Sequence, residues 1–120
     1  MYSAQLLDHF QNPRNGGELP GADASVRVEN PACGDVLELS ARLEQERIAE
    51  IRFRARGCVA AIACSSALTE LVRGHTLEEA RALERRQVVD AVGGLPNEST
   101  HASYLATDAL AALLKALVPR

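Results

Sequence analysis

Apolar and polar residues alternate along three consecutive segments in the first half of the chain, which predicts three β-strands. The first is short and half-buried, with Val26 and Val28 set between polar residues. The clearest covers residues 36–43, where leucine and alanine alternate with mostly polar residues, and the third covers residues 51–56. Because the connections between these segments are short, we expect neighbouring strands to run antiparallel as a three-stranded meander.

Helical patterns are found on both sides of the predicted strands. Residues 2–10 carry apolar residues at helical spacing behind a candidate N-cap, Ser3. Residues 59–72 are apolar nearly all round, as in a buried helix, and Gly74 marks a C-terminal stop. Both segments are therefore predicted helices, the second one inside the core.

Three further helices are predicted in the last part of the chain. Thr76 and Glu79 have the spacing of a capping box, which opens a short helix to about residue 83. Residues 84–92 predict another short helix, closed by two glycines. From a cap at Ser99 or Thr100, apolar residues recur at helical intervals as far as Leu117.

Composition bounds the class of protein. The 120 residues suffice for one domain, expected to cover 1–120, and the chain is 47% hydrophobic but only 3% aromatic, so its core must be aliphatic. A net charge of -3 gives no indication of a nucleic-acid binder. We see no signal peptide and no apolar run of membrane length, and the three cysteines are an odd number, so we expect a protein of the reducing cytoplasm that does not enter membranes.

The predicted topology brings two cysteines and an aspartate to one edge of the sheet. Cys33 and Asp35 precede the second strand, and Cys58 follows the third. The start of one strand and the end of its antiparallel neighbour lie at the same edge, so we expect these side chains to meet. Each cysteine also stands beside a glycine in a turn, where the backbone bends freely. Thiolate and carboxylate groups are suitable ligands for zinc or iron.

Each of these residues also has a structural interpretation. Cys58 at the start of the buried helix is placed to have its thiolate stabilised by the helix N-terminus, but it can equally be a small core residue. Asp35 can satisfy a local amide in a turn. Cys64, six residues after Cys58, is turned about 120° away on the helix and is expected to serve packing.

Histidines and arginines are the remaining polar candidates. His101 falls in the first turn of the last helix, either as a site residue or as a polar surface residue. His9 and His75 have no partner pattern and are expected to face solvent. A basic stripe on one face of the third strand indicates a solvated face, although an acidic partner can dock there; it consists of Arg52, Arg54 and Arg56.

Taken together, these motifs resemble those of the NifU/IscU/SufU family of iron–sulfur scaffold proteins over nearly the whole chain. The matching segments are Tyr-Ser at 2–3, Asp-His-Phe-x-Asn-Pro-Arg-Asn at 8–15, Asn-Pro-x-Cys-Gly-Asp at 30–35, Gly-Cys at 57–58 with Ala-Ile-Ala at 61–63, and His101. The resemblance implies an α+β fold in which helices pack on one side of the three-stranded antiparallel meander, as in IscU and SufE.

In that family, three cysteines hold a nascent [2Fe–2S] cluster or a zinc ion, helped by an aspartate and in some members by a histidine. The resemblance therefore implies metal ligands at Cys33, Asp35, Cys58 and His101, with no catalytic residue. It also implies two kinds of partner, a cysteine desulfurase that delivers sulfur and apo-proteins that accept the cluster.

The sequence departs from the family pattern at several points. The third family cysteine, which receives sulfur from the desulfurase, directly follows the histidine. Here that position is Ala102, so the sulfur-accepting thiol of the family is missing. Cys64 stands where the family usually has serine, so it is an extra thiol and a possible accessory ligand. Residues 95–99 (LPNES) keep little of the stretch that binds the dedicated Hsp70 chaperone, so its recognition is not expected. The insertion that marks zinc-dependent SufU proteins is not evident between Val72 and Leu95.

The leading hypothesis is a scaffold or metal-binding protein that holds a labile cluster or zinc for transfer to apo-proteins. One alternative is a SufE-like sulfur acceptor or regulatory partner of a cysteine desulfurase, which uses one reactive cysteine. Another is a degenerate paralogue that binds partners without chemistry. The sequence shows no nucleophile–base pair, phosphate loop or acid–base carboxylate couple, so we expect a carrier rather than an enzyme.

Overall fold

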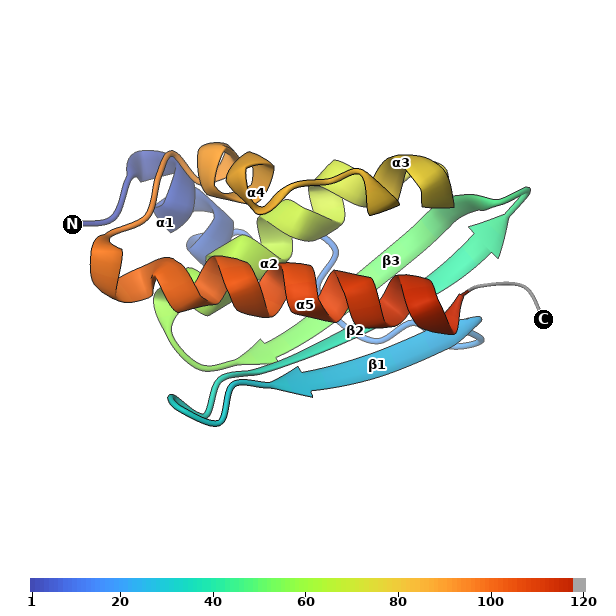
Figure 1. The fold of residues 1–120 in the computed structure, drawn as a ribbon, viewed down its shortest axis with the longest axis horizontal. Helices are drawn as coiled ribbons and strands as arrows, with labels where there is room; N and C mark the ends of the chain where they lie inside the picture. The colour runs from blue at the N-terminus through green and yellow to red at the C-terminus, as the bar shows by residue number, and fades with distance from the viewer. Residues whose placement is uncertain (118–120) are drawn as a thin grey trace.

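The fold is a three-stranded antiparallel sheet with helices packed on one face (Figure 1), as seen in a computed structural model that describes residues 1–117. The strands are β1 (Ala24–Glu29), β2 (Val36–Glu44) and β3 (Arg47–Arg56), paired in the order β1-β2-β3. The helices are α1 (Ala4–Gln11), α2 (Val59–Val72), α3 (Leu77–Arg81), α4 (Arg85–Ala91) and α5 (Thr100–Ala116), with a 3-10 turn, η1 (Asn97–Ser99), before the last. The predicted meander and its one-sided helical cover are confirmed.

The alternation of side chains along the strands determines which face of the sheet is buried. Leu37, Leu39 and Phe53 face the helices and are buried, whereas alternate residues such as Arg27 and Arg54 are exposed on the opposite face. Residues 45 and 46 both have positive φ (53° and 64°). β2 and β3 are therefore joined by a two-residue turn of type I′, whose twist matches that of the strands. A one-residue irregularity between Arg42 and Leu43 shifts the register of this pair near the turn.

The core lies between the sheet and two long helices, α2 and α5 (Figure 1). α2 packs against β3, α1 and α5, so small residues are buried on nearly every side of it, among them Ala60, Ala63 and Ala67. α5 lies across β1 and β2 and buries a stripe of alanine and leucine from Ala102 to Leu114. The predicted capping box of Thr76 and Glu79 is present at the start of α3.

The segment after α1 was predicted only as a loop, but part of it extends the sheet. Gly16 forms a parallel bridge with Phe53, and the flanking backbone bonds, Gly17 N–H to Phe53 O and Phe53 N–H to Asn15 O, are both 2.9 Å. The chain then passes to the outer face of the sheet, where Glu18 pairs with Arg54 at 2.8 Å. No strand pattern is evident in the sequence here, because the segment is rich in glycine and asparagine and apolar residues do not alternate with polar ones.

None of the helices within residues 1–117 combines the length and apolar character that crossing a bilayer requires.

Candidate functional site

Three segments that are distant in sequence meet at one end of the molecule (Figure 1). The loop between β1 and β2 carries Cys33, which is exposed, and Asp35 follows it just before β2. Cys58 is the N-cap of α2 directly after β3, and His101 lies in the first turn of α5. The structure therefore brings Cys33, Asp35 and His101 into one group, and it places Cys58 against Asp35 and His101.

Asp35 is the centre of this site. The residue is only 4% exposed, and its Oδ1 accepts the backbone N–H of Cys58 at 3.3 Å. Its Oδ2 lies 3.3 Å from the Sγ of Cys58, which donates to it, and 3.4 Å from Nε2 of His101. The Sγ of Cys58 and Nε2 of His101 are themselves 3.7 Å apart. The meeting of Asp35 and Cys58 at one sheet edge is confirmed.

Cys33 completes the group from the solvent side. One ligand atom each from Cys33, Asp35 and His101 lies within 4.8 Å of the others. The loop that carries Cys33 is closed on itself by two backbone bonds: Gly34 N–H to Asn30 O at 2.7 Å and Asn30 N–H to Asp35 O at 2.8 Å. Gly34 adopts φ +76°, which glycine tolerates easily, and this turn leaves the Cys33 thiol at the surface of the site.

The thiol of Cys58 is in a less favourable environment for ionisation than the sequence predicts. Burial raises its pKa, and the neighbouring Asp35 carboxylate adds to that effect. The backbone N–H of Ala61 donates to the Sγ at 3.4 Å and acts in the opposite direction, as expected at a helix N-terminus. The predicted stabilisation of the thiolate by the helix N-terminus is therefore present, but burial outweighs it.

Two further positions bear on the ligand set. The Cys64 side chain is fully buried among apolar residues, and burial raises the pKa of its thiol to about 12, so the predicted packing role is confirmed. An accessory ligand role would require Cys64 to leave the core. Ala102 is also fully buried, and its methyl group offers no ligand atom next to His101.

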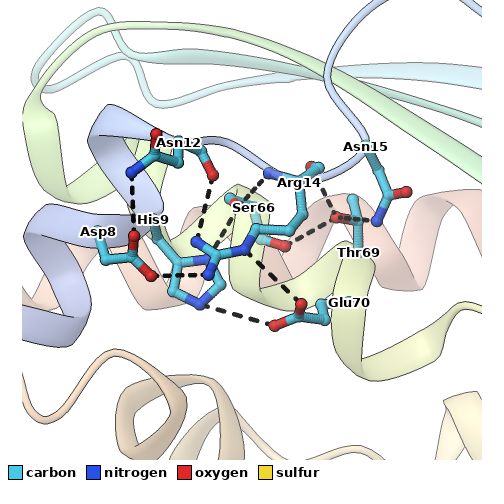
Figure 2. Close-up of polar contacts among 8 residues, drawn as sticks. All are labelled: Asp8, His9, Asn12, Arg14, Asn15, Ser66, Thr69 and Glu70. Carbon is cyan, nitrogen blue, oxygen red and sulfur yellow. Dashed lines mark hydrogen bonds and ion pairs between the residues drawn. The ribbon is translucent and has the colours of Figure 1, made fainter.

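A second polar cluster joins α1, the following loop and α2 (Figure 2). Within it, Nδ1 of His9 lies 2.8 Å from Oγ of Ser66, and the same Oγ accepts the backbone N–H of Arg14 at 2.9 Å. The Arg14 guanidinium bonds to Asp8 at 2.7 Å and lies 3.7 Å from Glu70. These contacts fix α1 and the loop after it to the middle of α2, away from the Cys33–His101 site.

The prediction that His9 faces solvent is wrong, because its side chain is buried and only 6% of the residue is exposed. Its position three residues after the buried Leu6 places both on one face of α1, and this spacing was the available signal. Desolvation lowers the pKa of His9, with a smaller contribution from Arg14, while Glu70 and Asp8 act in the opposite direction. His75, in contrast, is exposed as predicted.

The fold and the site together define a class of protein. The chain belongs to the family of the NifU-like N terminal domain, whose profile matches residues 1–118. It is 48% identical over 110 residues to the iron–sulfur cluster assembly scaffold protein IscU 1 of Archaeoglobus fulgidus, covering 92% of this chain and 72% of that protein. It is 41% identical over 117 residues to the scaffold protein IscU of Escherichia coli, covering 94% and 91%.

A solved structure agrees with this assignment at the level of the fold. The crystal structure of the N-terminal part of a nitrogen-fixing NifU-like protein from Brucella abortus superposes with a TM-score of 0.78 at 19% identity, covering 96% of this chain and 92% of that one. The family match and the IscU relatives at 41–48% identity favour the scaffold hypothesis and do not favour the sulfur-acceptor alternative.

Proposed function

We propose that this chain is an iron–sulfur cluster assembly scaffold that holds its cargo between Cys33, Asp35, Cys58 and His101. The observation that supports this proposal is the carboxylate of Asp35, which lies within 3.4 Å of both the Cys58 thiol and the His101 imidazole and in reach of Cys33. The scaffold relatives at 41–48% identity support the same function.

The donor set fits such a cargo chemically. Thiolates are soft ligands that suit iron–sulfur clusters and zinc, and imidazole ligation of a [2Fe–2S] centre has precedent. Two thiolates, one carboxylate and one imidazole can also close a tetrahedral zinc site. We propose the cluster as the cargo and zinc as a competing occupant of the same residues.

The exposure of the residues suggests how the cargo enters and leaves. Asp35 is buried behind the site, whereas Cys33 is exposed and the His101 side chain is 32% exposed. Both the arriving sulfur donor and the accepting apo-protein then approach from the side of Cys33. In this proposal those partners are a cysteine desulfurase and apo iron–sulfur proteins, and the setting is the cytoplasm.

The proposal is tested by anaerobic reconstitution with iron and sulfide, with absorbance and iron and sulfide content as readouts. The native chain is expected to assemble a cluster, and Cys33→Ala and Cys58→Ala are expected to assemble none. Cys64→Ala is the matched control, because it removes a thiol from the core and leaves the site intact. Full cluster content in both Cys33→Ala and Cys58→Ala would contradict the proposal.

A further inference from the structure

We infer that Gly57 is a positioning residue for the Asp35 carboxylate. Because Gly57 has no side chain, the carboxylate has room to reach both Cys58 and His101. The inference rests on the proposed function, because it names a residue on which the ligand set depends. Gly57 itself touches no cargo in this account.

The space that Asp35 occupies is the space that a side chain at position 57 would need. A Cβ atom placed on Gly57 would lie 2.2 Å from Oδ1 of Asp35, 2.5 Å from its Cγ and 3.0 Å from its Cβ. Side-chain carbons and carboxylate atoms pack at about 3.5 Å or more. The two carboxyl atoms would therefore have to move away, whereas the Cβ atom of Asp35 is only tightly approached.

Asp35 has little freedom to yield to such a contact. Its carboxyl group is separated from the backbone by a single carbon, and the residue is 4% exposed. Val36, the first residue of β2, pairs with Arg56, the last residue of β3. This register holds the backbones of the adjoining residues, Asp35 and Gly57, beside each other. Relief of the clash therefore requires the carboxylate to turn away.

That rotation would remove the contacts that define the centre of the site. Oδ1 would lose the backbone N–H of Cys58, and Oδ2 would lose the Cys58 thiol and the His101 imidazole. At the site, Gly57→Ala is thus expected to behave like Asp35→Ala, although residue 57 contributes no ligand atom.

Backbone strain is a separate effect, and the chain offers a control for it. Gly57 has φ +147°, in a region that residues with side chains rarely adopt. Gly17 has φ +118°, and a Cβ atom there would meet nothing within 4 Å. Gly17→Ala therefore introduces comparable strain without a clash, at a place outside the site.

The test is a Co²⁺ titration of the native chain, Gly57→Ala, Gly17→Ala, Asp35→Ala and the double variant Gly57→Ala with Asp35→Ala. We expect Gly57→Ala to weaken Co²⁺ binding by about tenfold or more, as loss of a supporting contact at a metal site does, and Gly17→Ala to change it by less than about twofold. In the Asp35→Ala background, Gly57→Ala should add less than about twofold, because the two substitutions remove one shared contact. A full additional loss in that background, or native affinity in Gly57→Ala, would overturn the inference.

A metal-free measurement separates this inference from the proposed function. The NMR signals of the Cys58 amide and the His101 ring should shift in Gly57→Ala as they do in Asp35→Ala, and stay at their native positions in Gly17→Ala. Unchanged signals in Gly57→Ala contradict the inference whether or not the native chain binds metal. If Gly57→Ala fails to fold, removal of the Asp35 side chain should restore folding; a double variant that is also unfolded means that strain alone requires the glycine, which contradicts the inference.

Discussion

Oδ2 of Asp35 lies 3.4 Å from Nε2 of His101, and this contact joins the start of β2 to the first turn of α5. The two residues belong to elements on opposite sides of the core, so their approach depends on the packing of α5 onto the sheet. The site is therefore formed by the tertiary fold, and a bound ion would link the last helix to the strands.

Metal binding should consequently stabilise the whole fold. A cation that binds only the folded chain raises the free energy of unfolding by about 2.7 kcal/mol when its free concentration is a hundred times its Kd. Thermal unfolding of the native chain should shift to higher temperature with Zn²⁺ and return with a chelator. Cys58→Ala, which removes one ligand, should show a much smaller shift; an equal shift would place the ion elsewhere.

The three cysteines should differ strongly in reactivity. Cys33 is exposed, Cys58 is partly buried and hydrogen-bonded to Asp35, and Cys64 is buried with a thiol pKa of about 12. Alkylation followed by mass spectrometry should label Cys33 first and Cys64 only after unfolding. Bound metal should protect Cys33 and leave Cys64 unchanged. Early labelling of Cys64 in the native chain would contradict the buried position of α2.

Stability should fall in mildly acidic solution because of His9. Burial lowers the pKa of His9 below its ordinary value of 6.5, so the unfolded chain binds the proton more readily than the folded chain. The resulting contribution to the free energy of unfolding is complete above pH 6.5 and is lost as the pH falls from there through the lower pKa of the folded state. Chemical denaturation between neutral pH and pH 5 measures this slope.

Two substitutions isolate the source of that slope. His9→Gln removes the titrating group from the cluster of Asp8, Arg14 and Glu70 and should flatten the slope. His75→Gln removes an exposed imidazole near Glu79 and should leave the slope as in the native chain. A slope that persists in His9→Gln would assign the acid sensitivity to another group.

Ser66 should be needed for the docking of the N-terminal helix. Its hydroxyl is the partner of both His9 Nδ1 and the Arg14 backbone N–H, so Ser66→Ala leaves the buried imidazole and the half-buried N–H without this partner. Such a loss destabilises a protein by about 1–3 kcal/mol. Ser25→Ala, on the exposed face of β1, should cost less than about 0.5 kcal/mol. Equal stability of the two variants in denaturant would show that the Ser66 contacts are not needed.

Local periodicity predicted the strands and helices because each buries one regular set of side chains. The alternation of Leu37, Leu39 and Ala41 predicted β2, and the hairpin geometry then placed Cys33 and Asp35 beside Cys58 without further information. His101 joined this group only through the family resemblance, since nothing local relates α5 to the sheet edge.

Other features depended on packing that no local pattern reports. The His9 imidazole is buried against Ser66 of a different helix, and the parallel pairing of Gly16 with Phe53 requires the loop after α1 to run beside the outer edge of β3. The contact between Gly57 and Asp35 is a close approach of the Asp35 side chain to the Gly57 backbone. The sequence indicates a glycine in a turn, but it does not indicate that the Asp35 carboxylate occupies the space next to that glycine.

The central claim, that two thiolates, a carboxylate and an imidazole hold the cluster although Ala102 replaces a third thiol, is tested most directly by pulsed EPR of the reduced, reconstituted native chain. A directly bound imidazole should give a nitrogen hyperfine coupling that is absent in His101→Ala and retained in His75→Gln. A cluster that forms in the native chain with no such coupling, and with a spectrum that His101→Ala leaves unchanged, would contradict the claim.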